Sequence, residues 1–300
     1  MINTVGLAPL LLPDLKHVYI EEGKERPPEH TYWANVEDLD WQGEKDLHLA
    51  GIGAMPSKPQ GTPFSTSEPI LGSTKTYTAN PFGLALEITW EMYRDDLYGV
   101  MVELIQGLSR AARFRQEVSA HKVLNNGFST SFVGFTAGEA LVQRSHVLLD
   151  GNTLHNTPAT SQTFSVLYLQ GMIQRFHAMT THRDAMPRLM APRTILITPQ
   201  NLFVAREILG STHKPFTADN EINSILQEEL SYAVNHFITN QNYHFTLAAR
   251  GEHDLNFKWR DHEIFDMYDD PRLKAAVATV YQRHTDGEFG AWEGCDGSGN

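Results

Sequence analysis

Histidines that lie beside carboxylates are the first candidates for chemistry in this sequence. The chain has 14 histidines, and imidazole and carboxylate groups are ligands that zinc takes from proteins. His177 and His182 lie five positions apart, which does not place them on one helical face. In the clusters 252–254 (Glu-His-Asp) and 261–263 (Asp-His-Glu), neighbouring side chains of a strand would point to opposite faces. We therefore interpret both clusters as solvated charge at strand ends and predict no metal site.

Motifs for covalent or phosphate chemistry are weak. Residues 134–138 read Gly-Phe-Thr-Ala-Gly, which imitates a nucleophile elbow with threonine in place of serine, but a turn explains them better. Gly51 and Gly53 lack the third glycine of a dinucleotide-binding loop. Asp95 and Asp96 could form a carboxylate pair, but at the start of a helix they complement its dipole. We predict no catalytic residue, no cofactor and no enzymatic activity, and rank an unrecognised hydrolase third among the possible functions.

Composition restricts the class of protein. The 300 residues are 41% hydrophobic and 20% charged, which is ample for one large core or two smaller ones. No apolar run approaches the roughly 18 residues of a membrane helix, and no signal peptide is evident. The single cysteine, Cys295, excludes an intrachain disulfide. A net charge of −12 without a basic stripe disfavours direct nucleic-acid binding, although an acidic protein can still enclose DNA.

A long helix over residues 91–125 is the element on which the chain is organised. Apolar or small residues recur there at helical spacing, namely Leu97, Val100, Met101, Leu104, Leu108, Ala111, Ala112 and Val118. Thr89 is a plausible N-cap. Gly99 and Gly107 each weaken the helix by about 1 kcal/mol relative to alanine. The helix is therefore held straight by packing, or it bends at these glycines.

Two segments before this helix lack a core of their own. Residues 1–45 contain prolines and scattered apolar anchors, which favours an extended arm laid over another surface. Residues 46–88 are rich in glycine, proline, serine and threonine, with strand-like pieces at 75–78 and 84–89. This pattern predicts a two-stranded ribbon, and such a ribbon is marginal unless another surface covers it.

The remainder mixes helices with strands. We predict helices over residues 161–180 and 201–209, and strands over 194–197, 243–248, 256–259 and 277–281. The tryptophans Trp90, Trp259 and Trp292 favour core positions over partner contacts. The fold class is α+β with an antiparallel character.

Five stretches carry a resemblance to a known family. They are GLALEITWEMYRDDLYG (83–99), LNNGF (124–128), DGNTLH (150–155), ILITPQNLFVAREILGS (195–211) and TDGEFGAWEGCDGSG (285–299). Each is weak alone, but their order and spacing span nearly the whole chain. The sequence resembles the major capsid proteins of tailed bacteriophages with the Hong Kong 97-type fold, and most closely the Mu-like major head subunits.

The resemblance implies a division of the chain. Its parts are an N-terminal arm (1–45), an E-loop (46–88), a P-domain (89–154) with its spine helix (91–125), an A-domain (155–250) and a return to the P-domain strands (251–300). Some relatives carry a cleaved scaffolding segment before the arm. Here the arm begins almost at Met1, so we expect either a mature form or scaffolding by a separate protein.

The resemblance also implies a structural function. Subunits of this family assemble into pentamers and hexamers, which close an icosahedral head around double-stranded DNA without reading its sequence. The implied location is the virion, after assembly in the host cytoplasm. The implied partners are further copies, a scaffolding protein, a portal and, in some relatives, a decoration protein. The alternative is another virion component that forms a small closed oligomer.

Eight residues are candidates for assembly contacts. They are Tyr32, Trp33, Lys58, Lys75, Tyr77, Trp90, Asp95 and Asp96. Some relatives join an E-loop lysine to an asparagine, and Lys58 and Lys75 lie in the ribbon, but most relatives lack this crosslink and we expect none. Deletion of residues 1–45 is expected to abolish closed shells and to leave a soluble A-domain.

Overall fold

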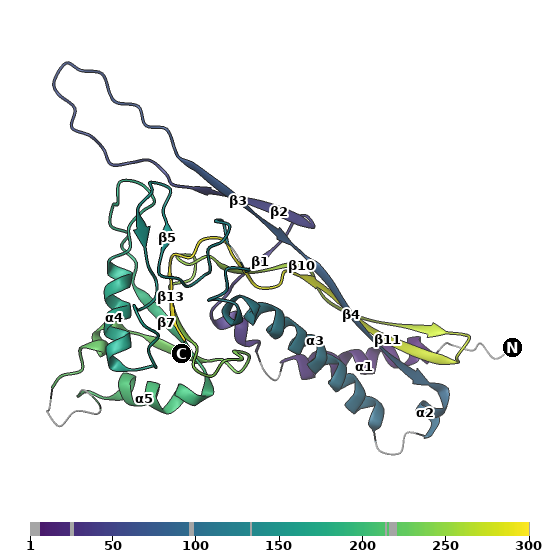
Figure 1. The fold of residues 1–300 in the computed structure, drawn as a ribbon. Helices are drawn as coiled ribbons and strands as arrows, with labels where there is room; N and C mark the ends of the chain where they lie inside the picture. Colours follow the sequence, from purple (N-terminus) through teal and green to yellow (C-terminus); the bar gives the residue numbers. More distant parts are fainter. Residues whose placement is uncertain are drawn as a thin grey trace.

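The computed structural model of the chain describes residues 7–24, 27–95, 99–132, 134–213, 215 and 221–299. Two bodies are joined side by side, and a long ribbon extends from them (Figure 1). The helices are α1 (Leu7–Lys24), α2 (Trp90–Asp95), α3 (Val100–Asn125), α4 (Val166–His177) and α5 (Leu202–Gly210), with short 3-10 turns at Glu29–Tyr32, Pro199–Asn201 and Ser224–Glu228. None of the helices in these described ranges has the length and hydropathy needed to cross a bilayer.

The first body is a sheet covered on one face by α1 and α3. Its strands are β1 (Asn35–Asp38), β10 (Leu255–Asp270), β11 (Ala275–His284) and β4 (Asn80–Thr89) in that order, with β12 (Glu288–Phe289) paired to β10. β1 runs parallel to β10, and the other pairs are antiparallel. Because side chains alternate along a strand, one face of the sheet supplies the core against the helices, namely Ile88, Phe265, Met267, Ala276, Ala278 and Val280.

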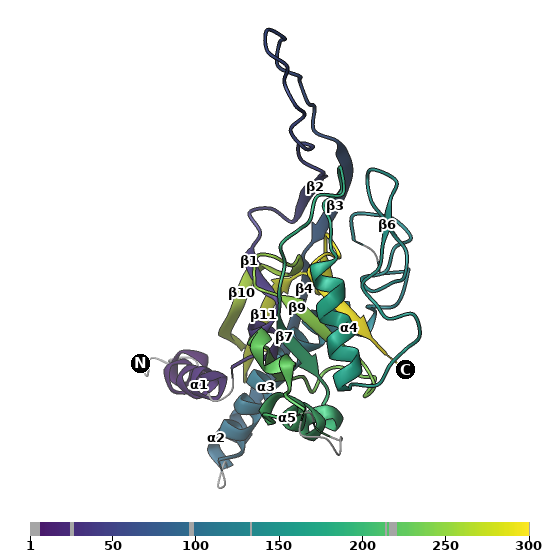
Figure 2. The same ribbon diagram turned by 90° about the vertical axis from the view of Figure 1, so that its left-hand side faces the viewer.

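The second body is a smaller sheet with two helices. Strands β13 (Cys295–Ser298), β9 (His244–Ala248), β7 (Pro192–Ile197) and β8 (Ser231–Val234) lie in that order. Figure 2 shows α4 and α5 in front of this sheet. Ser165 caps the start of α4, and its hydroxyl accepts a hydrogen bond from the Tyr168 amide at 3.3 Å. A short hairpin of β5 (His146–Val147) and β6 (Thr153–Leu154) lies beside the second body.

The ribbon consists of β2 (Gly43–Leu49) and β3 (Leu71–Thr78), paired antiparallel. Residues 50–70 form its tip and contain no regular strand or helix. The predicted ribbon over 46–88 is therefore shorter than expected, because the strand piece at 84–89 lies in β4. That strand pairs with β11 along its whole length and belongs to the first body.

The prediction of an extended arm over residues 1–45 is wrong at α1, which is helical. Leu7, Leu11, Leu15 and Tyr19 recur every four residues and are buried against α3 and β10. Pro13 lies inside this helix, where proline costs about 3 kcal/mol. Tertiary burial of the apolar face outweighs that local cost. The sequence analysis gave more weight to the prolines and therefore predicted an extended arm.

The predicted spine helix is interrupted. Thr89 caps α2 as expected, since its hydroxyl accepts a hydrogen bond from the Met92 amide at 3.3 Å. Helix α3 begins after Gly99, which has a φ of +70°. A left-handed residue cannot continue a right-handed helix, so the chain turns at the first of the two glycines. Asp96 and its neighbours 97 and 98 lie outside the described residues.

The C-terminal segment visits both bodies. β10, β11 and β12 complete the first sheet, but β13 pairs with β9 in the second sheet. The last strand therefore ties the two bodies together.

Candidate assembly surfaces

The tip of the ribbon presents large apolar side chains to solvent. Met55 is 95% exposed and Phe64 is 84% exposed. Lys58 lies over the Phe64 ring, with its ammonium 4.8 Å from the ring centre. Figure 1 shows that the tip reaches well beyond both bodies.

The base of the ribbon is fixed to the first body through a buried lysine. The Lys258 side chain, only 5% exposed, lies 3.3 Å from Glu37 and 3.5 Å from Asp46. Its ammonium also lies 4.2 Å from the centre of the buried Tyr77 ring. Burial alone would lower the pKa of Lys258, but the surrounding carboxylates outweigh burial and raise it. The amine therefore stays charged and joins β10 to β1 and β2.

A loop of the second body clasps the ribbon from the other side. We call residues 181–187 the clasp loop. Asp184 accepts a hydrogen bond from the Ala54 amide at 2.7 Å, and Arg183 donates to the Glu68 carbonyl. Asp184 and Ala185 both have positive φ angles, 58° and 46°. Non-glycine residues hold this conformation only where their surroundings require it, so the ribbon contacts constrain the clasp loop.

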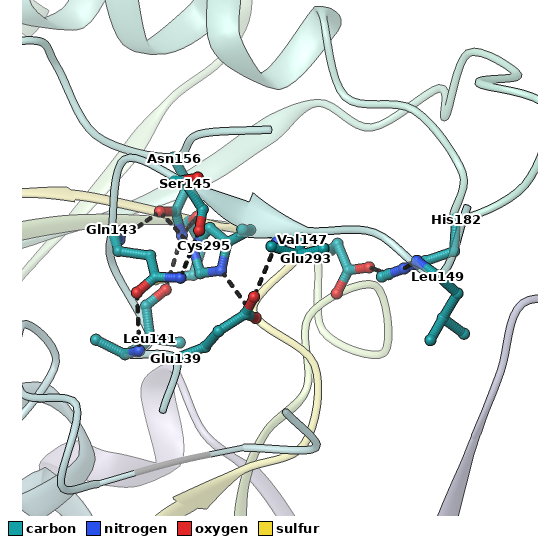
Figure 3. A network of polar contacts seen from close by, with 12 residues as sticks. Glu139, Leu141, Gln143, Ser145, Val147, Leu149, Asn156, His182, Glu293 and Cys295 are labelled. Carbon is teal, nitrogen blue, oxygen red and sulfur yellow. Dashed lines mark hydrogen bonds and ion pairs between the residues drawn. The ribbon is translucent and has the colours of Figure 1, made fainter. Parts of the chain in front are cut away.

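His182 of the clasp loop lies at one end of a network of polar groups (Figure 3). The Asn156 amide donates to the carbonyls of Leu141 at 2.8 Å and Cys295 at 3.0 Å. The His146 ring contacts Asn156 at 3.0 Å and Glu139 at 3.4 Å, and it stacks on Trp292 with ring centres 3.9 Å apart. Burial lowers the pKa of His146 despite these oxygens. The network fastens the C-terminal segment to the loops before and after the β5–β6 hairpin.

Further large apolar side chains are exposed on the bodies. On the outer face of the first sheet, Ile264 and Tyr281 lie opposite each other on β10 and β11, and Tyr268 lies on the same face. On the second body, Leu189 is 96% exposed and Phe203 is 70% exposed.

The structure places the eight predicted assembly residues in different settings. Tyr32, Lys58, Trp90 and Asp95 are exposed, Lys75 is half-buried and Trp33 and Tyr77 are buried, while Asp96 lies outside the described residues. The Lys75 ammonium lies 3.2 Å from the Glu288 carboxylate. Trp33 and Tyr77 pack inside the chain and are not available for contacts in this conformation. Their role in assembly stays a prediction, as do the roles of the others.

Other expectations for single residues also change. Trp259 and Trp292 are core residues as expected, but Trp90 is 44% exposed. Asp95 is the last residue of α2, so it does not complement the dipole at the start of a long helix. The exposed apolar residues of the ribbon tip, Met55 and Phe64, were missed, although apolar side chains in a stretch rich in proline and glycine were a signal for them.

The sequence clusters considered for chemistry are divided by the fold. His262 contacts Asp38 at 2.8 Å, whereas Glu263 accepts hydrogen bonds from Tyr19 and Gln116. Asp254 is mostly buried, and its carboxylate accepts the Ala291 amide at 2.8 Å. The backbone at Gly134 packs closely against Gly290, where a Cβ on residue 134 would stand 2.2 Å from the Gly290 carbonyl oxygen. These residues serve packing and loop geometry.

The sequence pattern of a family described as phage capsid protein matches residues 72–284, which is more than two thirds of the chain. The chain belongs to this family of phage capsid proteins. It is a structural component of the virion and not an enzyme. No curated protein matches this capsid protein by sequence.

Solved capsid structures share the fold. The virus-like particle from Pyrococcus furiosus matches with a TM-score of 0.56 at 8% identity, covering 95% of this chain and 98% of that one. A capsid subunit of a native GTA particle matches with a TM-score of 0.56 at 8% identity, covering 90% and 89%. The Mycobacterium phage Adephagia subunit matches with a TM-score of 0.55 at 10% identity, covering 91% and 90%. The capsid protein therefore has the α+β, Hong Kong 97-type fold predicted from its sequence, while the Mu-like resemblance stays a prediction.

Proposed function

We propose that this capsid protein assembles into pentamers and hexamers that close an icosahedral head around double-stranded DNA. The observation that carries the proposal is the ribbon tip, where Met55 and Phe64 are almost fully exposed in a chain of a capsid family. A monomer gains nothing from holding such side chains in water. A neighbouring subunit would cover them, so that much of the stability belongs to the assembly.

The division of the chain follows from this proposal. Residues 46–88 act as the E-loop, with the tip at 50–70 lying on a neighbour. Residues 89–154 and the strands after 250 form the P-domain, and residues 155–250 form the A-domain. Residues 1–45 act as an arm whose helix α1 is held on the P-domain, while its exposed Leu10 and Ile20 face outward for another subunit.

Charge supports a shell that encloses DNA without gripping it. The net charge of −12 makes strong phosphate contacts unfavourable over most of the surface. Assembly would take place in the host cytoplasm with a scaffolding protein and a portal, and a decoration protein is a further candidate partner.

The test is assembly of the full chain, expressed alone or with its neighbouring phage genes. Sedimentation velocity and negative-stain microscopy should show closed particles, tubes or hexamer sheets. The double variant Met55→Ser, Phe64→Ser should remove them and leave the unassembled chain folded by circular dichroism. Gln60→Ser, in the same loop, should assemble normally. If the double variant assembles as well as the parent, the tip does not carry assembly.

The alternative of a small closed oligomer makes a different prediction. A discrete oligomer of fixed mass, unchanged when scaffold is present, would replace the shell proposal. Deletion of residues 1–45 is not a clean test, because it would strip α1 and Trp33 from two cores. The truncated chain would fail to assemble for reasons of folding alone.

A further inference from the structure

A cluster of two histidines and one glutamate lies where the ribbon meets the second body, at the end of β2 next to the tip. In the described part of the chain, His48, His182 and Glu293 each offer a ligand atom, and these atoms lie within 4.8 Å of one another. His48 comes from β2 of the ribbon, His182 from the clasp loop and Glu293 from the segment before β13. We propose that these three side chains bind a zinc-class divalent metal ion, which fastens the ribbon to the second body.

The donor set fits this class of metal. Two imidazoles and one carboxylate are ligands of zinc sites that keep a fourth position for water. His182 and Glu293 already face each other, and Nε2 of His182 is hydrogen-bonded to Oε1 of Glu293 (Figure 3). A metal would replace the shared proton between these two atoms.

The third ligand is poised beside this pair. The His48 ring lies edge-on to the His182 ring with centres 4.4 Å apart, and it stacks on Phe135 at 4.9 Å. His48 is half-buried on a strand of the ribbon, so a small rotation brings a ring nitrogen toward the other two ligands. Gly72 on β3 leaves the space, since a Cβ there would stand 3.1 Å from the Cβ of His48.

An unsatisfied oxygen provides a second, independent sign of a ligand. The Glu293 side chain is 2% exposed, and its Oε2 atom has no hydrogen-bond partner among the described residues. A buried carboxylate oxygen without a partner is rare in folded proteins. A cavity of about 10 Å³ is lined by His48, His182 and Glu293 together with Glu139, which is room for one water-sized ligand.

Two contacts oppose metal binding. Nδ1 of His182 accepts the Leu149 amide at 3.3 Å, and this contact must loosen when the ring proton moves to Nδ1. Arg188 lies 3.6 Å from Oε1 of Glu293. Its side chain is 38% exposed, so it can turn into solvent when a cation takes its place.

Bound metal would set the angle of the ribbon against the second body. The three ligands come from three segments that otherwise meet through hydrogen bonds of the clasp loop. The consequence for shells rests on the proposed capsid assembly, whereas metal binding by the unassembled chain does not.

The test uses the unassembled full-length chain, freed of metal by a chelator. Zinc titration by calorimetry should show one ion per chain, and cobalt should give the visible absorption of a tetrahedral site. His48→Ala removes one of the three ligands and should weaken zinc binding more than about tenfold. His48 is the least buried of the three ligands, so this substitution disturbs the fold least. Glu293→Gln should do the same, and His177→Ala, an exposed histidine on α4, should leave binding unchanged.

Melting temperature gives a second readout. Zinc should raise it for the parent and for His177→Ala but not for His48→Ala. No saturable binding, or equal binding by all four proteins, would overturn the site and leave a plain ion pair of His182 with Glu293. Loss of shells in the ribbon-tip variant tests the proposed function separately, because that variant keeps all three ligands.

Discussion

Arg175 on α4 and Asp296 on β13 form a two-pronged ion pair inside the second body. The guanidinium Nε lies 2.6 Å from Oδ2, and Nη2 lies 2.8 Å from Oδ1. The Tyr168 hydroxyl donates to the same carboxylate at 3.0 Å. Burial raises the pKa of Asp296 to about 6, although Arg175 and Tyr168 oppose that shift. The pair binds the last strand to the helix that covers it.

Removing one member of this pair should cost more than removing both. Arg175→Met leaves the buried Asp296 charge without its cationic partner, which is expected to lower the free energy of unfolding by about 3–5 kcal/mol at pH 7. The double variant Arg175→Met, Asp296→Asn should lose clearly less. Urea unfolding of the unassembled chain measures both. An equal or larger loss of unfolding free energy in the double variant would contradict this prediction. It would show that the attraction within the pair exceeds the cost of removing both charges from water.

The two glycines of the predicted spine helix should respond in opposite directions. Gly107→Ala should raise the free energy of unfolding by about 0.5–1 kcal/mol, because a Cβ there meets open space in mid-helix. Gly99→Ala should lower it by about 1–2 kcal/mol, because Gly99 has a φ of +70°. Thermal and urea unfolding check both, and stabilisation by both substitutions would mean that α2 and α3 join into one helix.

Stability should fall in acid because of histidines buried as neutral rings. Burial lowers the pKa of His244 and of His284 to about 4, below the usual value of about 6.5. The unfolded chain therefore binds more protons between pH 4 and 6.5. The contribution of these two histidines to the free energy of unfolding is fully present above about pH 6.5. It is lost as the pH falls toward 4, by about 1.4 kcal/mol per pH unit for each histidine.

Urea unfolding across this pH range tests that linkage. His284→Gln should reduce the slope of stability against pH by about one proton, whatever it does to stability at pH 7. His177→Gln, at an exposed site, should leave the slope unchanged. An unchanged slope in His284→Gln would mean that this ring is already charged in the folded chain.

Lys258 should be needed to hold the ribbon base. Lys258→Met retains the apolar stem but removes the charge shared with Glu37 and Asp46. We expect a loss of about 1.5–3 kcal/mol in the free energy of unfolding, the usual worth of hydrogen bonds to charged groups. Hydrogen exchange should speed up in β2 while α5 is unaffected. Lys45→Met, at an exposed position of the same strand, is the matched control.

Many helices and strands were predictable because the spacing of apolar residues follows the repeat of a helix or a strand. Apolar spacing indicated α3, α4 and α5, and alternation indicated the strands at 256–259 and 277–281, which lie within β10 and β11. The order of the five quoted stretches predicted the capsid fold that the family match and the solved structures share. The helices and strands depend on residues close together in the chain, and the family resemblance depends on the order of short stretches along it. The sequence alone therefore determined both.

Only the tertiary structure decided the rest. α1 is helical despite Pro13 because its apolar face is buried against α3 and β10, and that contact energy is absent from any local pattern. His182 stood beside His177 in the sequence, but in space it meets His48 and Glu293, the latter 111 residues away. Which distant side chains meet depends on how whole elements pack, and burial, not spacing, then sets their charge and their partners.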